Sequence, residues 1–213
     1  MARRTSAVEL KIAIKQRKMR LICGYRRTGK DTLCQQINEG TISWLVYTKE
    51  GAGVPLGAFR PGPRRAFADR LKGEVQALLK AENIIFSYED EKDSRHFTYQ
   101  GRDMTYRQLC IEHGCRMREI DPCYWIRGIN SDGEDVIVTD FRFPNEYSFP
   151  RETDPNIITI RVFRKEVPIP PVGEPSEHSL DNFLTDLLLV PSEADFTEAL
   201  KLFPQYRAYQ RAT

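Results

Sequence analysis

A short apolar segment that runs into a glycine-containing turn constrains the fold of this chain more than any other feature. The segment Met19–Cys23 is followed over 24–32 by Gly-Tyr-Arg-Arg-Thr-Gly-Lys-Asp-Thr, which fits the pattern G-x-x-x-x-G-K. This arrangement predicts a buried strand, a tight turn and then a helix over about 31–38 that closes near Gly40. Glycines in such a turn let successive backbone N–H groups point inward at an anion, and the helix adds its positive end. The pattern therefore predicts a phosphate-binding loop.

Within this loop, the residue types indicate separate tasks. Lys30 is expected to reach the β- and γ-phosphates of a nucleoside triphosphate as a point charge, and Thr32 to hydrogen-bond the α-phosphate. Asp31 stands where the usual pattern has the Ser or Thr that binds magnesium, and its carboxylate would repel phosphate unless it faces the cation, directly or through water. A glycine-lysine turn that binds no nucleotide is the alternative. The candidate ATP-binding residues are Gly24, Arg26, Arg27, Thr28, Gly29, Lys30, Asp31 and Thr32.

Short apolar strands alternate with helical segments along the rest of the chain. Strand-forming runs cover 41–48, 66–68, 135–141, 157–163 and 187–190, and helical patterns cover 70–81, 105–118, 196–209 and a segment that begins at Asn145, with Thr105 as an N-cap. The segments 51–63 and 167–175 are expected to be loops, and the polar, charged segment 87–102 an exposed excursion. The alternation predicts βαβ units around a parallel sheet.

The strongest strand pattern, Val136-Ile137-Val138-Thr139, leads to Asp140. Ligands of parallel α/β sheets bind outside the carboxyl ends of the strands, so Asp140 is expected to face the same crevice as the phosphate loop. A carboxylate there can hold magnesium through water, orient the attacking group or bind a substrate cation. The alternative is an aspartate that only caps a turn. Arg142 projects from the same edge.

The predicted helix over 105–118 and the segment after it are basic, with Arg107, Arg116, Arg118 and Arg127. Arg107 and Arg118 lie eleven residues apart, which is about three helical turns, so they share a face. Guanidinium groups bind phosphate through two parallel hydrogen bonds, as a phosphate-bearing acceptor requires. For each arginine, the alternative is a solvated helix surface.

The five cysteines show no paired spacing and are expected to be free thiols in a reducing compartment. A zinc site would use Cys110, His113, Cys115 and Cys123. The spacing C-x-x-H-x-C lacks the usual paired knuckle, however, and its members would converge poorly on a helix. We therefore expect packing thiols rather than zinc ligands.

Length and composition are those of one compact domain, with 213 residues, 40% of them hydrophobic and 29% charged. These values exclude a collagen, a coiled coil and wholesale disorder. The longest apolar run, Leu187–Val190, is far shorter than the ~18 residues that cross a bilayer. No apolar stretch follows the basic start of the chain, so no secretory signal is expected. A soluble, cytoplasmic protein is the expectation.

Charge is distributed unevenly, although the net charge is only +2. Residues 1–30 hold ten Lys or Arg and one acid, whereas residues 166–200 hold eight acids and no Lys or Arg. A basic block attracts polyanions, and a nucleotide-responsive or nucleic-acid-binding module led by the arm 1–18 is one alternative. Because the last basic residues of the block fall inside the phosphate loop, we favour a solvated extension and expect no nucleic-acid partner.

With these motifs, the chain resembles the P-loop deoxynucleoside monophosphate kinases of phages and large DNA viruses, which are related to animal phosphomevalonate kinases. The resemblance covers about 20–190 and includes Gly29-Lys30-Asp31-Thr32, Phe67-Ala68-Asp69-Arg70-Leu71-Lys72, Thr105-Tyr106-Arg107, Asp121-Pro122 with Trp125, Asp140-Phe141-Arg142-Phe143-Pro144-Asn145-Glu146, and Ser176-Glu177 before Leu180-Asp181. The Gly-Lys-Asp loop is common to both relatives. The segment 176–183 is similar to phosphomevalonate kinase, but the arginine-rich lid of that enzyme is missing here. We favour the nucleotide enzyme and keep phosphomevalonate kinase as the alternative.

The resemblance implies a P-loop NTPase-like, three-layer α/β/α fold with a parallel sheet. A single kinase domain would cover 19–213 after a basic extension over 1–18, with an acceptor-binding insertion at about 69–128 and a short lid at about 164–180. The implied enzyme transfers the γ-phosphoryl group of ATP to the 5′-phosphate of a deoxynucleoside monophosphate. It would act in the cytoplasm, which for a viral protein is that of the host. A homodimer is left open, as is the choice of base.

The resemblance also implies roles for individual side chains. The implied catalytic residues are Lys30, Arg142 and Arg164. The implied acceptor-binding residues are Asp69, Arg70, Lys72, Arg107, Arg118, Asp140 and Arg142. ATP and Mg²⁺ are the implied cofactors, with Asp31 and Asp140 as the metal-binding pair. No general base is expected, because the acceptor phosphate is already ionised at neutral pH.

Overall fold

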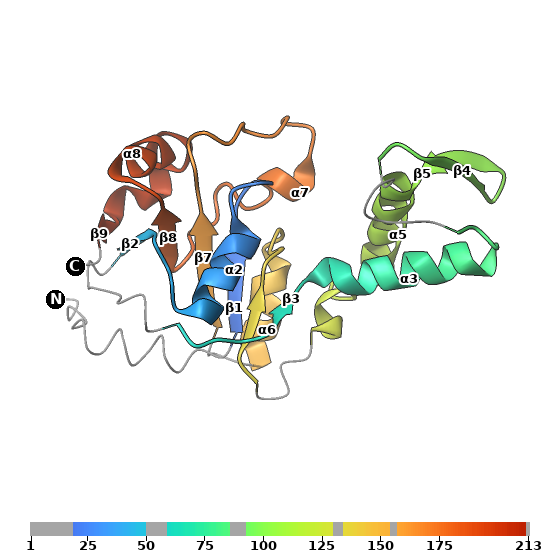
Figure 1. The fold of residues 1–213 in the computed structure, drawn as a ribbon, viewed down its shortest axis with the longest axis horizontal. Helices are drawn as coiled ribbons and strands as arrows, with labels where there is room; N and C mark the ends of the chain where they lie inside the picture. The colour runs from blue at the N-terminus through green and yellow to red at the C-terminus, as the bar shows by residue number, and fades with distance from the viewer. Residues whose placement is uncertain (1–18, 50–58, 86–92, 130–133, 154–156, 212–213) are drawn as a thin grey trace. The chain divides into compact units, whose positions relative to one another are not determined.

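Seven strands form one mixed sheet in the computed structural model, which describes residues 19–49, 59–85, 93–129, 134–153 and 157–211 (Figure 1). The strands are β1 (Met19–Cys23), β2 (Leu45–Thr48), β3 (Arg64–Arg65), β6 (Val136–Val138), β7 (Ile157–Val162), β8 (Leu187–Val190) and β9 (Gln210–Arg211), in the spatial order β3-β6-β1-β7-β8-β2-β9. β1 pairs in parallel with β6 and β7, and the pairs β3–β6 and β7–β8 are also parallel. The fold is therefore α/β with a mostly parallel sheet.

The α-helices of the described residues are α2 (Lys30–Glu39), α3 (Phe67–Ala81), α5 (Tyr106–Ile120), α6 (Asn145–Thr153), α7 (Pro175–His178) and α8 (Glu193–Leu202). Two 3₁₀ helices, η2 (Ile126–Gly128) and η3 (Pro204–Ala208), accompany them. The predicted helix ends are confirmed at Gly40, which ends α2 with φ +69°, and at Thr105, whose Oγ1 accepts the Gln108 N–H of α5 at 3.2 Å. None of the described helices is long and apolar enough to cross a membrane.

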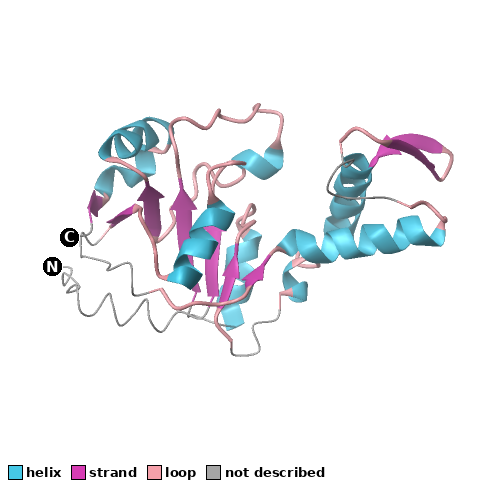
Figure 2. Ribbon diagram, viewed as in Figure 1, coloured by secondary structure: helices cyan, strands magenta, loops and turns pink. Residues whose placement is uncertain are grey.

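The sheet buries apolar side chains on both faces because neighbouring residues of a strand point to opposite sides. In β8, Leu187 and Leu189 pack in one cluster with Leu33 of α2. The alternate residues Leu188 and Val190 belong to a second cluster with residues of α8 and η3. Helices therefore cover both faces of the sheet, which is compatible with a three-layer α/β fold (Figure 2).

The chain divides into two compact units, which are described separately. The sheet unit comprises 1–65 and 131–213, and its described part holds the seven-stranded sheet. The helical unit comprises 66–130 and holds α3, α5, η2 and a hairpin of β4 (His96–Tyr99) and β5 (Arg102–Thr105). This unit has its own apolar core, centred on Val75, Leu79 and Leu109. The stretch 69–128, where the sequence suggests an acceptor-binding insertion, falls inside the helical unit.

The expected end of a short strand over 66–68 is wrong in position. The strand is Arg64–Arg65, and Phe67 already belongs to the first turn of α3. Asp69 Oδ2 accepts the N–H of Ala66 at 2.9 Å, which caps this helix start. Three apolar residues are too few to show a period, so burial of Phe67 in a helix could not be distinguished from burial in a strand.

The expected exposed excursion over 87–102 is confirmed only in part where the structure describes it, because most of 93–102 is exposed but Phe97 and Tyr99 are buried. Residues 96–99 form β4, in which Phe97 and Tyr99 are buried in the core of the helical unit. The hairpin turns at Gln100 and Gly101, which have positive φ angles of 49° and 75°. A two-residue turn of this kind is usually predicted from Asn-Gly or Asp-Gly. The Gln-Gly pair found here is not one of these signals, so the sequence did not indicate the hairpin. Residues 87–92 lie outside the described residues.

Three further expectations need correction. The sheet is not wholly parallel, because β2 runs antiparallel to both β8 and β9. Short buried strands have the same apolar pattern in either direction, so the sequence could not show this. The expected strands over 41–48 and 135–141 shrink to Leu45–Thr48 and Val136–Val138. The expected helix over 196–209 is divided, since Pro204 begins η3 after α8 has ended. The basic extension 1–18 and residues 51–58 of the expected loop lie outside the described residues.

Candidate functional site

The loop between β1 and α2 has the backbone conformation that its glycines predict. Gly24 and Gly29 have φ angles of +143° and +94°, and a methyl group on Gly24 would lie 2.4 Å from the Val162 carbonyl oxygen of β7. Thr28 is buried, and both its N–H and its Oγ1 donate to the Tyr25 carbonyl, at 3.3 and 2.8 Å. These contacts hold the loop in a curl at the carboxyl end of the sheet.

Lys30 folds back into this curl. Its Nζ donates to the carbonyl oxygens of Gly24 and Tyr25, both at 2.8 Å. Burial lowers the pKa of Lys30, and the positive charge of Arg142 lowers it further, whereas the negative charge of Glu177 raises it. The ammonium group thus lies inside the loop, close enough to Arg142 and Glu177 for both charges to shift its pKa.

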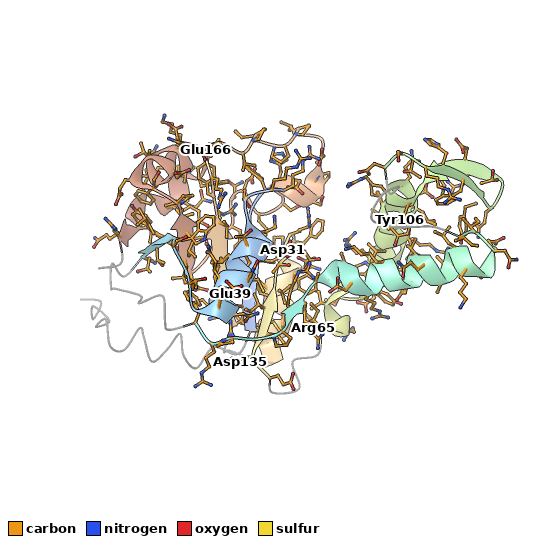
Figure 3. All side chains as sticks on the ribbon, in the orientation of Figure 1. Asp31, Glu39, Arg65, Tyr106, Asp135 and Glu166 are labelled. Carbon is orange, nitrogen blue, oxygen red and sulfur yellow. The ribbon has the colours of Figure 1, made fainter. Side chains whose placement is uncertain are left out.

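Asp31 lies in the first turn of α2 and connects this helix with the edge of the sheet (Figure 3). Its Oδ1 accepts hydrogen bonds from Arg64 Nε at 2.7 Å and from Thr139 Oγ1 at 2.9 Å. Burial works to raise the pKa of Asp31, but the hydrogen bonds from Arg64 and Thr139 outweigh it and lower the pKa. Asp31 is therefore ionised near neutral pH. The sequence did not indicate either partner.

The strand β6 brings a second group of predicted residues to the same edge as the loop. Because β1 and β6 are parallel, their carboxyl ends lie side by side, and Thr139 of this edge bonds to Asp31. Asp140 follows directly and is half-buried. Arg142 lies two residues further on and donates through Nη1 to Glu177 of α7 and to the Ser176 carbonyl at 3.4 Å.

Arg164, two residues after the end of β7, also lies beside the loop. The Arg164 guanidinium stacks over the Trp44 ring, with 4.8 Å between Cζ and the ring centroid. A methyl group on Gly29 would lie 3.5 Å from the Trp44 ring and 3.7 Å from Arg164 Cζ. Arg164 Nε is buried without a hydrogen-bond partner among the described residues. Three predicted residues, Lys30, Arg142 and Arg164, are therefore arranged around one loop.

The remaining predicted loop residues differ in their exposure. Arg26, Arg27 and Thr32 are exposed, and Arg27 has a positive φ of 66°. The backbone N–H of Arg26 donates to Glu177 Oε2 at 2.8 Å, and its guanidinium pairs with Glu174 at 3.5 Å. The sequence indicated Arg26 as a ligand of phosphate, but it gave no sign that Glu177 of α7 and Glu174, the residue before this helix, contact it.

The other predicted acceptor-binding residues belong to the helical unit, where each has a described environment. Asp69 caps α3, as noted above, and Arg70 pairs with Glu74 at 2.9 Å. Arg107 pairs with Asp93 on the surface. Lys72 and Arg118 are half-buried. Asp69 thus has a structural role, and an acceptor-binding role for all of these residues stays a prediction.

A polar cluster in the helical unit was not predicted. The Glu74 carboxylate accepts hydrogen bonds from Arg70 Nε, Tyr124 Oη and His113 Nε2, at 2.9, 2.8 and 2.9 Å. Burial works to raise the pKa of Glu74, but hydrogen bonds, from His113 first, lower it overall. Because the Arg70 guanidinium also stacks 3.8 Å over the Tyr124 ring, the cluster ties α3 and α5 to the segment before η2.

The cysteines are free thiols, and His113 of the rejected zinc pattern contacts Glu74 instead. Among the described residues, no group of three or more His, Cys, Asp or Glu side chains is placed to hold a metal ion. Mg²⁺ in phosphoryl-transfer sites commonly keeps several waters and uses one or two carboxylates together with substrate phosphates. Asp31 fits this mode, because it is ionised and 71% exposed, and the hydrogen bonds from Arg64 and Thr139 both go to the same carboxylate oxygen, Oδ1.

A scan of the sequence against protein-family models found no match, and a search of the curated proteins found none either. The case for a function therefore depends on the loop and on the charged groups around it.

Proposed function

We propose that the chain is an ATP-dependent kinase that transfers the γ-phosphoryl group of ATP to the 5′-phosphate of a deoxynucleoside monophosphate. The observation that carries the proposal is the position of Lys30, whose ammonium group lies inside a glycine-bounded loop between a parallel strand and a helix. Such a loop offers inward backbone N–H groups and the positive end of α2 to phosphate oxygens. The charged groups nearby then favour transfer over mere binding.

Phosphoryl transfer needs placement and charge compensation more than covalent chemistry. Lys30 would bind the β- and γ-phosphates, and Arg142 and Arg164 would compensate the charge that develops on the transferred group. Asp31 and Asp140 would hold Mg²⁺, which supplies further charge compensation when bound. Acceptor-binding roles are proposed for Asp140 and Arg142 of the sheet unit and, separately, for five residues of the helical unit: Asp69, Arg70, Lys72, Arg107 and Arg118.

The substrate class is tested by a coupled ADP-release assay. Each deoxynucleoside monophosphate is offered in turn, together with mevalonate 5-phosphate and a reaction that contains no acceptor. We expect turnover that requires a deoxynucleoside monophosphate. Turnover with mevalonate 5-phosphate alone supports the alternative kinase, and ATP binding without turnover supports a nucleotide-responsive module. No turnover with any nucleotide refutes the proposed acceptor.

The loop assignment is tested by Lys30→Met, which keeps the apolar stem of the side chain and removes its charge. We expect kcat to fall about 10²–10³-fold, the range seen when one preorganised charge or donor is removed from a transition-state site. Lys201→Met is the matched control, because Lys201 lies on α8 and pairs at the surface with Glu198. Unchanged turnover in a folded Lys30→Met protein contradicts the assignment.

A further inference from the structure

The carboxylate of Glu177 occupies an unusual position beside the phosphate loop. Its Oε2 accepts the backbone N–H of Arg26 at 2.8 Å, and its Oε1 accepts Arg142 Nη1. The side chain is only 5% exposed although α7 is a short helix of four residues. Nearly complete burial of a glutamate requires partners of this kind, because an ionised carboxylate is costly to remove from water.

The partners of Glu177 are the groups that bind a phosphoryl oxygen in other proteins. Backbone N–H groups of a glycine-containing loop bind anions, and guanidinium groups bind carboxylate and phosphate with the same geometry. The Glu177 charge also acts on Lys30, whose pKa it raises against the effects of burial and Arg142. An internal anion thus stands among three positive or donating groups that the proposed function assigns to phosphate.

Contacts C-terminal to Glu177 also hold this segment against the loop. Tyr25 Oη of the loop donates to Asp181 Oδ1 at 3.1 Å, and the rings of Tyr25 and His178 lie 5.6 Å apart. These contacts use side chains only and none of the inward N–H groups of the loop. Displacement of the Glu177 carboxylate would release the Arg26 N–H and remove the carboxylate partner of Arg142, which would keep its hydrogen bond to the Ser176 carbonyl.

We propose that the Arg26 N–H and the Arg142 guanidinium form a phosphoryl subsite, and that Glu177 occupies it as an intramolecular competitor of a nucleoside triphosphate. The proposal rests on the proposed function, since it takes the loop to be a phosphate site. It adds that the chain carries its own anion for this subsite, so that the phosphoryl group and the Glu177 carboxylate cannot bind there at the same time. The regulated step is the displacement of one carboxylate.

The neighbouring Glu174 shows why Glu177 is singled out. Glu174 pairs with the Arg26 guanidinium at 3.5 Å, but both side chains are well exposed, at 39% and 53%. Exposed ion pairs are worth little because water screens them. The backbone N–H of Arg26 goes to Glu177 and not to Glu174, so Glu174 provides a matched control on the same short segment.

The test measures binding of inorganic triphosphate, and separately of ATP with magnesium, to the full chain by calorimetry. Glu177→Gln keeps the size of the side chain and removes its charge, so the competitor is weakened while the donors remain. We expect the Kd for triphosphate to fall about tenfold or more, which corresponds to about 1.4 kcal/mol, and Glu174→Gln to leave it unchanged. An unchanged or higher Kd in Glu177→Gln overturns competition. A higher Kd would show that Glu177 instead holds Arg142 in a productive orientation.

A second measurement on the unaltered chain covers the case in which Glu177→Gln fails to fold. Hydrogen exchange of the amides in 174–183 is compared with and without saturating triphosphate. Competition predicts faster exchange when triphosphate is bound, because the segment loses the contacts of Glu177 with Arg26 and Arg142. Unchanged or slower exchange overturns it. If the unaltered chain binds neither triphosphate nor ATP, the proposed function fails as well. If triphosphate binds, but Glu177→Gln leaves its Kd unchanged and binding leaves the exchange rates unchanged, competition by Glu177 is overturned and the proposed function is not.

Discussion

Replacing Gly24 with alanine adds one methyl group at the tightest point of the phosphate loop. The new Cβ would lie 2.4 Å from the Val162 carbonyl oxygen and 2.9 Å from Thr28 Oγ1. The first of these neighbours is backbone in β7, which is held by its pairing with β1 and cannot move cheaply. The φ of +143° is in addition a conformation that side chains with a Cβ rarely adopt.

Two costs therefore add in Gly24→Ala. The strained backbone contributes about 1–3 kcal/mol, and overlap in a well-packed region contributes about 1–3 kcal/mol. Gly40→Ala separates the two, because Gly40 also has a positive φ of +69° but no atom within 4 Å of the added methyl group. Gly40→Ala should cost only the left-handed backbone term of about 1–2 kcal/mol. Gly24→Ala should therefore be the more destabilising by about 1–3 kcal/mol, the overlap term alone.

The assay is urea unfolding followed by tryptophan fluorescence. The chain has two tryptophans, and in a Trp125→Phe background only Trp44, which is buried in the sheet unit, reports on unfolding. Both alanine variants are compared in this background, with the free energy of unfolding extrapolated to water. Equal losses in the two variants, or a larger loss in Gly40→Ala, would refute the argument that Gly24 is required by close approach to β7.

Two further outcomes are expected. Thr105→Ala should lower the free energy of unfolding of the helical unit by about 1 kcal/mol, because it removes the N-cap of α5. Thr105→Ser keeps the oxygen that accepts the Gln108 N–H and should cost less, so equal losses in the two variants would exclude capping as the cause. The hydrogen bond to Asp181 raises the pKa of His178 above 6.5, so the protonated imidazole stabilises the fold fully below pH 6.5, and this stabilisation is lost as the pH rises through the raised pKa. An NMR titration of His178 measures this pKa, and a midpoint at or below 6.5 would contradict the prediction.

Much of the sheet unit could be predicted from the sequence because its signals are local. Gly40 ends α2 in the left-handed conformation that glycine favours, and the β-branched residues of 157–163 form β7. The errors occurred where a signal was short or was masked by composition. The segment 66–68 offered too few residues to show a period. The strand His96–Tyr99 buries two aromatic rings within a mostly polar stretch.

The candidate site was predictable only in part, for a related reason. The spacing of glycines and lysine identifies a loop because those residues act within one turn of the chain. The partners that complete the loop come from distant segments: Asp31 bonds to Thr139 of the β6 edge, and Arg26 bonds to Glu177 across 151 residues. No local pattern records such contacts. The only signal for Glu177 was its place in the segment 176–183, and that signal gave no role.

The charge around the loop gives a reason for the carboxylate of Glu177, which comes from a distant part of the chain. Burial and the charge of Arg142 both lower the pKa of Lys30, so the protonated form of the lysine is costly unless an anion lies nearby. A bound phosphate would supply that anion, and Glu177 supplies it from within the chain. The same carboxylate should therefore stabilise the free protein and weaken its binding of phosphate. Asp31 differs because its hydrogen bonds go to Arg64 and Thr139, outside the loop, so it can remain ionised beside a phosphate without competing for the donors of the loop.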